Sequence, residues 1–590
     1  TGALGILYLI EHRISAGRIL HWPVGPKLHL SGMVVVVALL IAWGFALERF
    51  QLLYTEEHEP QFFGPGLLET AYFLPLIWCS VLSLLGTTIA GLWFLHRRKG
   101  GWPLALLVVV FGLSIGLRHI HFIPAAFERF IVDPNPVRSE VDHMQANIDS
   151  TLRGFDLTRI TNIDVSPGLP DEDVLDPELR SHLYNIPVWD PEILYDGYQQ
   201  LQGIRPYYQF SEVDVDRYLV NGRLEQINLA AREVNIRRLP KEAQNWENEH
   251  LRFTHGYGAV ATPASQNGQT PMRWYLQDLS MESSNGFTAS SRPDLYYGEE
   301  DLTYAIVPNQ LKVVGIPSAD EQSSYNYTGS GGVQINSLFR KLLFSLYFRD
   351  ERLFFSVSIN GDSRALFHRN IVDRIQTLTP FLKLDHDPYI VVTPTRVYWV
   401  IDAYTTSDWY PISKRISGRF NHEDHDQHFN YIRNSVKIIV DGYDGHVDYY
   451  VSDTSDPIIQ GYRNAYPGLF KDIATLPPNL KSHLRYPKDL FNHQMKIYAR
   501  YHQTQPELFY EQAETWDFSK VNDAIVKPYY LTTSLEAYAD DRHTFVMIEP
   551  MTPVGRSNLS VLAVAGNFDD GLDPSLPYGS SRQIVIYRFN

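Results

Sequence analysis

The sequence predicts a membrane α-helical anchor followed by a large α+β domain with mainly antiparallel sheet. Two observations lead to this division. Three long apolar runs lie within the first 125 residues: Leu30–Leu47, Ala71–Leu95 and Trp102–Leu117. After about Phe130 the chain turns polar and aromatic, and helical stretches alternate with strand-like ones. The apolar runs predict the anchor, and the mixed periodicity predicts the α+β domain.

The apolar runs have the length that a bilayer demands. A hydrocarbon core about 30 Å thick takes roughly 20 helical residues to cross, and the middle run provides them without a charge. We therefore predict membrane spans at about 30–49, 69–95 and 102–120. The apolar stretch before Glu11 is expected to be the end of a truncated earlier span.

Charges in the short loops predict how the spans face. Basic residues precede the first span and fill the loop between the second and third, whereas the loop between the first and second is acidic. Short cytoplasmic loops are enriched in Lys and Arg, so the basic loops are expected in the cytoplasm and the body after the third span outside it. The residues are Arg13, Arg18, Lys27, Arg97, Arg98 and Lys99, against Glu56, Glu57 and Glu59.

Composition limits the chemistry and the partners. A formal net charge of −16 argues against nucleic acid or an anionic lipid surface as the main partner, because both reward clustered Lys and Arg. The expected partners are the lipid bilayer and either other proteins or a second copy of the chain. The only cysteine, Cys79, lies inside the second apolar run, so an intrachain disulfide is impossible and thiol catalysis is excluded.

Periodicity predicts the elements of the body. Apolar residues at three- and four-residue intervals predict helices, with prolines interrupting the last of these segments: Glu140–Leu152, Trp189–Gln202, Ser337–Phe348, Arg364–Phe381 and Pro457–Trp516. Alternating or β-branched stretches predict strands: Val213–Val220, Gly256–Thr262, Leu302–Val314, Thr544–Glu549, Ser560–Ala565 and Gln583–Phe589.

Two further segments resemble each other. Val397–Ser407 and Lys437–Ser452 share an aliphatic-Asp-small-Tyr element, and Asp444-Gly445 marks a hairpin turn in the second. This likeness suggests a degenerate duplication. We divide the chain into a transmembrane region (1–125), a mixed helix and strand segment (126–250), a β-rich central part with both similar hairpins (251–455), and a helical segment with closing strands (456–590).

Several motifs carry a resemblance to a known family. They include WDPEILYDGYQQLQGIRPYYQFSEVDVDRY, YTGSGGVQINSLFRKLLF, YWVIDAYTTSDWYPIS and NYIRNSVKIIVDGYDG. These strings resemble motifs of uncharacterised protein family 0182, a family of bacterial multi-pass membrane proteins, and the likeness spans nearly the whole chain. It implies about seven spans before an extracytoplasmic domain, hence about four spans before Thr1, a portion beyond Asn590, and a place in the inner membrane. It supplies no reaction to carry over.

One histidine-rich segment is a candidate transition-metal site. Imidazoles three residues apart meet a metal if the segment folds into a turn. A solvated polar loop between two strands is the alternative, and it accounts for the same composition. The segment holds His422, Glu423, Asp424, His425, Asp426 and His428.

Acidic turns suggest calcium, because they offer hard oxygen ligands. One surrounds Gly571 and the other Gly445, but neither has the closing Glu of an EF-hand, and turns use the same residues for conformational reasons. The first comprises Asn567, Asp569, Asp570 and Asp573, and the second Asp441, Asp444 and Asp448.

Two further candidates have simpler explanations. The glycine segment Thr328–Gly332 precedes a predicted helix, where backbone amides attract phosphate, but it lacks Gly-Lys-Ser/Thr and is expected to be a tight turn. Asp385-His386-Asp387 precedes a strand and is expected to be a turn held by Asp side chains. No nucleophile elbow is present, so no catalytic residue and no cofactor-binding residue is assigned.

Paired aromatic residues are the most distinctive feature of the body. If each pair occupies neighbouring strand positions, one ring enters the core and the other faces outward, which favours a recognition surface. Dense core packing is the alternative. The pairs are Tyr207-Tyr208, Tyr296-Tyr297, Tyr398-Trp399, Trp409-Tyr410, Tyr449-Tyr450 and Tyr529-Tyr530.

Three classes of function remain. The favoured one is a membrane-anchored extracytoplasmic binding or assembly module, such as a subunit of an envelope complex. The second is a metal-dependent enzyme that uses the histidine-rich segment. The third is a transporter whose pathway uses spans before Thr1, since the visible apolar runs hold no charged residue and Glu69 lies at the edge of one.

Overall fold

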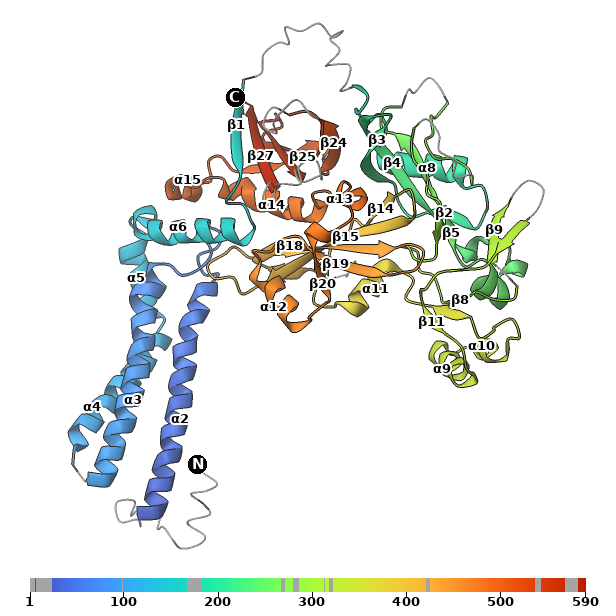
Figure 1. The fold of residues 1–590 in the computed structure, drawn as a ribbon. Helices are drawn as coiled ribbons and strands as arrows, with labels where there is room; N and C mark the ends of the chain where they lie inside the picture. The colour runs from blue at the N-terminus through green and yellow to red at the C-terminus, as the bar shows by residue number, and fades with distance from the viewer. Residues whose placement is uncertain are drawn as a thin grey trace.

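Three long helices project from one side of a large body in the computed structural model (Figure 1). The structure describes residues 6, 24–97, 99–166, 183–266, 271–279, 286–311, 313–317, 322–420, 425–535, 543–567 and 582–589. The expected truncated span before Glu11 and the segment around His422 lie largely or wholly outside these residues.

The projecting helices match the predicted spans. They are α2 (Val24–Gln51), α3 (Leu74–Arg97) and α4 (Gly101–His119). All three are long and apolar enough to cross a membrane, α3 together with the π-helical turn η3 (Glu69–Phe73) that precedes it. Most of their exposed side chains are apolar. Helices with apolar residues on all faces are stable in a bilayer but not in water.

Polar contacts tie the helices to one another. The Ser80 and Ser114 hydroxyls are 2.9 Å apart between α3 and α4, and Arg118 of α4 forms an ion pair with Glu48 near the end of α2. In a bilayer no hydrophobic effect drives helices together. Small polar side chains at the helix interface allow the close packing that holds them instead.

The body contains three larger sheets, whose described ladders are mostly antiparallel as predicted; β1–β27 and β19–β20 are parallel. The central sheet has β13 (Lys383–Leu384), β14 (Tyr389–Val392), β15 (Val397–Ser407), β18 (Tyr431–Asp441), β19 (Val447–Val451) and β20 (Phe470–Asp472). An N-terminal sheet has β2 (Tyr208–Phe210), β3 (Asp214–Val220), β4 (Arg223–Val234) and β6 (Ala259–Pro263). The C-terminal sheet has β1 (Thr161–Val165), β21 (Trp516–Phe518), β24 (Tyr529–Thr533), β25 (Thr544–Pro553), β26 (Val561–Asn567) and β27 (Arg582–Phe589).

Short ladders and helices complete the body. The ladders join β8 (Ala305–Val307), β11 (Val333–Gln334) and β12 (Arg364–Leu366), and pair β9 (Val313–Pro317) with β10 (Gln322–Tyr325), β5 (Gly256–Tyr257) with β7 (Asp294–Leu295), β16 (Ile416–Gly418) with β17 (Gln427–Phe429), and β22 (Lys520–Val521) with β23 (Ala524–Ile525). The helices include α5 (Phe122–Phe127), α6 (Pro136–Gly154), α8 (Pro191–Gln202), α9 (Leu338–Phe348), α10 (Glu351–Phe355), α11 (Ile371–Leu378), α12 (Pro457–Ala465), α13 (Pro478–Lys481), α14 (Lys488–Tyr501) and α15 (Pro506–Glu511).

Two large apolar clusters form the core. One lies between the N-terminal and central sheets and includes Ile227, Trp399 and Ile438. The other joins α6 and α14 to the C-terminal sheet and includes Met144, Met495 and Met547. Because β1 pairs with β27, chain segments far apart in sequence complete one sheet. The four-part division of the chain stays a prediction.

One predicted helix is wrong in its first half. Arg364–Phe381 contains strand β12, which pairs with β8 and β11, and then helix α11. The break falls at Asn370, whose side chain accepts a hydrogen bond from the Asp373 amide and so begins the helix. The predicted start signal of the helix at 189–202 is confirmed, because the Asp190 carboxylate accepts a hydrogen bond from the Glu192 amide at the start of α8.

The two similar segments are neighbouring strands. β15 pairs with β18 in the middle of the central sheet. Their hairpin partners run in opposite chain order, since β14 precedes β15 whereas β19 follows β18. The duplication itself stays a prediction.

The aromatic pairs are mostly core residues, which corrects the expectation that each pair has an outward ring. Both members of the pairs at 207–208, 296–297 and 449–450 are buried. Only Trp409 and Tyr529 are strongly exposed among the paired residues. The exposed apolar surface of the body lies mainly elsewhere.

Candidate functional site

A polar cavity is the first candidate site. It has a volume of about 500 Å³ and lies where the turn between β18 and β19 meets the glycine segment. That volume is in the range of about 300–1,000 Å³ that small-molecule pockets occupy. The lining residues are Ser330, Gly331, Gly332, Arg374, Leu378, Arg396, Asp441, Asp444, Gly445, His446 and Val447.

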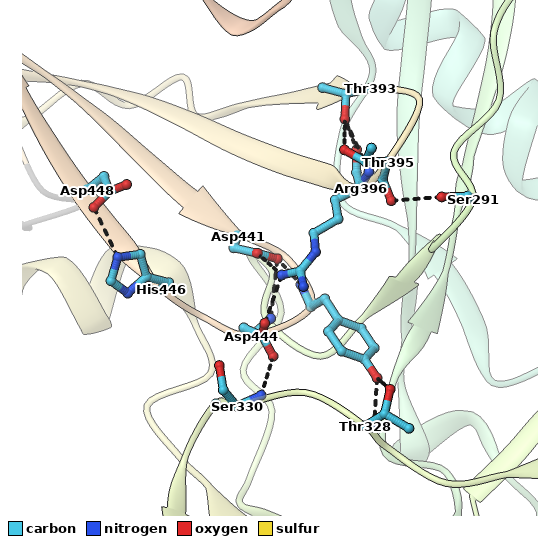
Figure 2. Close-up of polar contacts among 12 residues, drawn as sticks. Ser291, Thr328, Ser330, Thr393, Thr395, Arg396, Asp441, Asp444, His446 and Asp448 are labelled. Atoms are coloured by element: carbon cyan, nitrogen blue, oxygen red, sulfur yellow. Dashed lines mark hydrogen bonds and ion pairs between the residues drawn. The ribbon is translucent and has the colours of Figure 1, made fainter. Parts of the chain in front are cut away.

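Arg396 is the central charged group of this cavity. Figure 2 shows its guanidinium between the carboxylates of Asp441 and Asp444, with which it forms ion pairs. Burial alone would raise the pKa of Asp444, but hydrogen bonds from Tyr327 and Arg396 hold it below its usual value. The carboxylates that suggested calcium in this turn are therefore occupied by a guanidinium, and His446 binds the third, Asp448, at 3.0 Å.

The glycine segment packs on the same turn. The Ser330 amide donates to Asp444 Oδ1 at 3.0 Å, as the Tyr327 hydroxyl does at 2.6 Å. A Cβ at Gly329 would lie 2.0 Å from Asp444 Oδ1, so a side chain there has no room. These contacts fit a tight turn that closes onto the domain rather than a phosphate-binding loop.

A partly buried carboxyl cluster is the second candidate site. Glu212, Asp214 and Asp387 each place one oxygen within 4.8 Å of the others. Two cations from the start of α14 and the residues before it approach them. Arg485 donates to Asp387 at 2.6 Å, and Lys488 lies 3.0 Å from the same carboxylate.

Part of this cluster has no hydrogen-bond donor. Asp214 is 4% exposed; its Oδ2 accepts from the Ile390 amide at 3.0 Å. Its Oδ1 lies 3.8 Å from Arg485 in an ion pair but receives no hydrogen bond from the described residues. Glu212 Oε1 likewise lacks a donor there. Such oxygens favour a proton or a hard cation as a further partner.

The three carboxyl groups of the cluster have different pKa values. Burial, assisted by Glu212, raises the pKa of Asp214 well above its usual value. Burial and the charge of Asp387 raise the pKa of Glu212 to about 7. Burial alone would raise the pKa of Asp387, but the charges of Arg485 and Lys488 hold it below its usual value. The cluster therefore binds protons near neutral pH.

Sequence reasoning missed this cluster. Its local signal is the alternation in Glu212-Val-Asp214, which puts two carboxylates on one face of an extended chain. The third member, Asp387, lies far away in sequence, in the Asp385-His386-Asp387 turn. That turn is held as predicted, because the Asp387 amide donates to Asp385 Oδ1 at 2.8 Å.

The predicted metal ligands are not gathered into a site by the described residues. His425 is exposed, and exposed His428 in β17 has its Nδ1 3.1 Å from the Ser417 hydroxyl. Asp426 forms an ion pair with Arg419 at 2.9 Å. The prediction for Asn567, Asp569 and Asp573 also stays untested, because only the backbone of Asn567, at the end of β26, is described.

The cluster predicts a specific pH dependence. The folded pKa of Glu212, about 7, lies above its ordinary value of 4.5, so the folded state binds more protons in this window and stability falls as pH rises through it. Glu212→Gln removes this loss of folding stability, which is on the order of 2 kcal/mol. Melting temperatures of the detergent-solubilised protein between pH 5 and 8 should therefore fall less for this variant, while exposed Glu507→Gln should match the unchanged protein. Equal slopes for all three would contradict the assignment.

The comparisons with known proteins identify the family. The profile of an uncharacterised protein family, UPF0182, matches residues 2–589. A UPF0182 protein of Methylococcus capsulatus is 53% identical over 99% of this chain and 66% of its own length. Those of Syntrophobacter fumaroxidans and Nitrosococcus oceani are 42% and 41% identical over 99% of this chain, covering 65% and 68% of their own lengths.

These matches show which family the chain is related to and how much of its relatives it covers. The chain spans about two thirds of the length of these curated relatives. No solved structure matches it. The resemblance carried by the sequence motifs is confirmed: the chain belongs to the uncharacterised protein family UPF0182.

Proposed function

We propose that this chain is part of an integral membrane protein whose body lies outside the cytoplasm and binds a polar ligand there. The junction between the spans and the body carries the proposal. The loop between α2 and α3 is fixed to the body by backbone and side-chain contacts. They are Ile412 N to Leu53 O at 3.1 Å, Tyr54 Oη to Trp409 O at 2.9 Å, Arg415 to Glu56 at 3.0 Å, Lys414 to Glu59 at 2.6 Å, and Arg500 to the carbonyls of Pro60 and Gln61.

Buried acids strengthen the same junction. Glu140 of α6 is 4% exposed and accepts a hydrogen bond from the Leu67 amide at 2.9 Å. Glu69, at the start of the second span, is 2% exposed and lies 2.8 Å from His58 Nε2. Buried carboxylates with such partners hold their surroundings in one arrangement, because separation leaves them unpaired.

This geometry supports the orientation. The acidic loop and the body share one end of the spans, and the basic loop around Lys99 lies at the other. The positive-inside rule assigns the basic end to the cytoplasm. The body then faces the opposite side, which in a bacterial inner membrane is extracytoplasmic.

The polar cavity around Arg396, whose polar contacts Figure 2 draws, is the proposed ligand site. Its lining has two guanidinium groups, Arg374 and Arg396, and two carboxylates, Asp441 and Asp444. These formal charges cancel, so the lining suits a neutral or zwitterionic polar ligand better than a strongly charged one. Protein partners, a second copy of the chain and a role in an envelope complex stay predictions.

Cysteine labelling in intact cells tests the orientation. In a Cys79→Ser background, exposed Glu57→Cys and Asp196→Cys should react with a membrane-impermeant maleimide, because both lie on the side of the body. Exposed Lys99→Cys should react only after permeabilisation. Labelling of Lys99→Cys alone in intact cells would show the opposite orientation.

Native mass spectrometry of the full-length protein purified from its membranes tests ligand binding. Leu378 is 54% exposed at the cavity, so Leu378→Trp narrows it without removing a charged group. We expect a small bound molecule on the unchanged protein and on the control Leu559→Trp, which lies outside the cavity, and several-fold less on Leu378→Trp. Absence of any bound molecule, or equal occupancy in all three, would contradict the proposed ligand site.

A further inference from the structure

The helical hairpin α9–α10 has an unusual distribution of apolar side chains. Its inner face is ordinary core: Phe344 and Phe348 pack against a buried cluster that includes Trp246, Ile306 and Leu353. The helix begins at Ser337, whose hydroxyl accepts from the Arg340 amide at 3.2 Å. The hairpin is thus a well-anchored part of the body.

The outer face of the hairpin is also apolar. Eight large side chains there are between 43% and 85% exposed. A water-facing helix places polar residues opposite its buried face, whereas a helix that is apolar all round is buried in protein or in lipid. The exposed residues are Leu338, Phe339, Leu342, Leu343, Leu346, Tyr347, Phe355 and Val357.

The place of the hairpin identifies what covers it. Figure 1 shows α9 and α10 at the end of the body far from the spans, hanging on the same side from which α2, α3 and α4 project. A bilayer crossed by these three helices extends beneath the body toward the hairpin. Because the junction fixes the body to the spans, the hairpin cannot turn away from that surface while the junction is intact.

The charges of the hairpin fit a lipid surface. Arg340, Arg349 and Arg352 of the hairpin are exposed, against one exposed acidic residue, Glu351. Helices that lie in the membrane interface combine a buried apolar face with Lys and Arg that reach lipid phosphates. Contiguous apolar patches of this kind mark membrane or protein contact sites, and the exposed arginines and the position favour the membrane.

We propose that α9–α10 is a second membrane contact, whose apolar face lies in the interfacial region of the leaflet nearest the body while its arginines bind lipid phosphates. The inference rests on the proposed function, because it takes the spans to lie in the same bilayer. The body is then held to the membrane at both ends, and the segment between them stands over the lipid surface.

Spin-label accessibility in liposomes of phosphatidylethanolamine and phosphatidylglycerol tests this contact. Full-length protein with Cys79→Ser carries one nitroxide at a time. Phe339→Cys and Leu346→Cys report on the hairpin, Leu40→Cys of α2, 66% exposed, on a span, and exposed Asp196→Cys of α8 on water. We expect the ratio of oxygen to nickel-chelate accessibility at both hairpin sites to be several-fold above that at Asp196→Cys and below that at Leu40→Cys near the middle of α2, because the ratio increases with depth in the bilayer.

The controls separate the possible failures. A lipid-like ratio at Leu40→Cys with a water-like ratio at both hairpin sites would overturn the second contact and leave the proposed anchoring intact. A water-like ratio at Leu40→Cys would contradict the anchoring and the contact together. Hairpin sites shielded from both reagents would show a protein partner in place of lipid and would also overturn the proposal.

Discussion

Glu140 accepts a hydrogen bond from the Leu67 amide inside the junction between the spans and the body, and the rest of the structure depends on that junction. Leu67 lies between two spans, and Glu140 belongs to the first long helix after the third span. The loop that carries Leu67 also forms ion pairs through Glu56 and Glu59 with the segment after β15. The body therefore has one orientation relative to the helices, which no flexible tether would give.

That orientation relates distant features of the chain to one another. It places the basic loop and the body at opposite ends of α2, α3 and α4, and it places the α9–α10 hairpin on the side of the body from which these helices project. Elsewhere in the body, the charges at the two candidate sites follow the same rule as in the junction, namely that a buried charge has a partner of opposite sign or a proton. Arg396 forms ion pairs with Asp441 and Asp444, and Arg485 forms one with Asp387. The Glu212 and Asp214 carboxyl groups of the cluster bind protons near neutral pH instead.

Local signals account for what the sequence predicts well. The spans follow from apolar length, the start of α8 from Asp190, and the β18–β19 hairpin from Asp444-Gly445, each readable within a few residues. Long-range contacts account for what it misses. Nothing near Asp444 indicates that Arg396 and the glycine segment converge on it, nothing near Glu212 indicates Asp387, and the pairing partners of β12 override a helical pattern. Aromatic pairs failed as surface markers at 207–208, 296–297 and 449–450 because neighbouring residues cover both rings, which local alternation cannot reveal.

Cryo-electron microscopy of the full-length protein in lipid nanodiscs tests the central claim most directly, because it images the bilayer and the body together. The account predicts lipid density around α2, α3 and α4, the body fixed at one end of them through the loop at residues 52–68, and disc density that reaches the outer face of α9. A body that varies in orientation relative to the spans, or one whose hairpin points away from the disc, would contradict it.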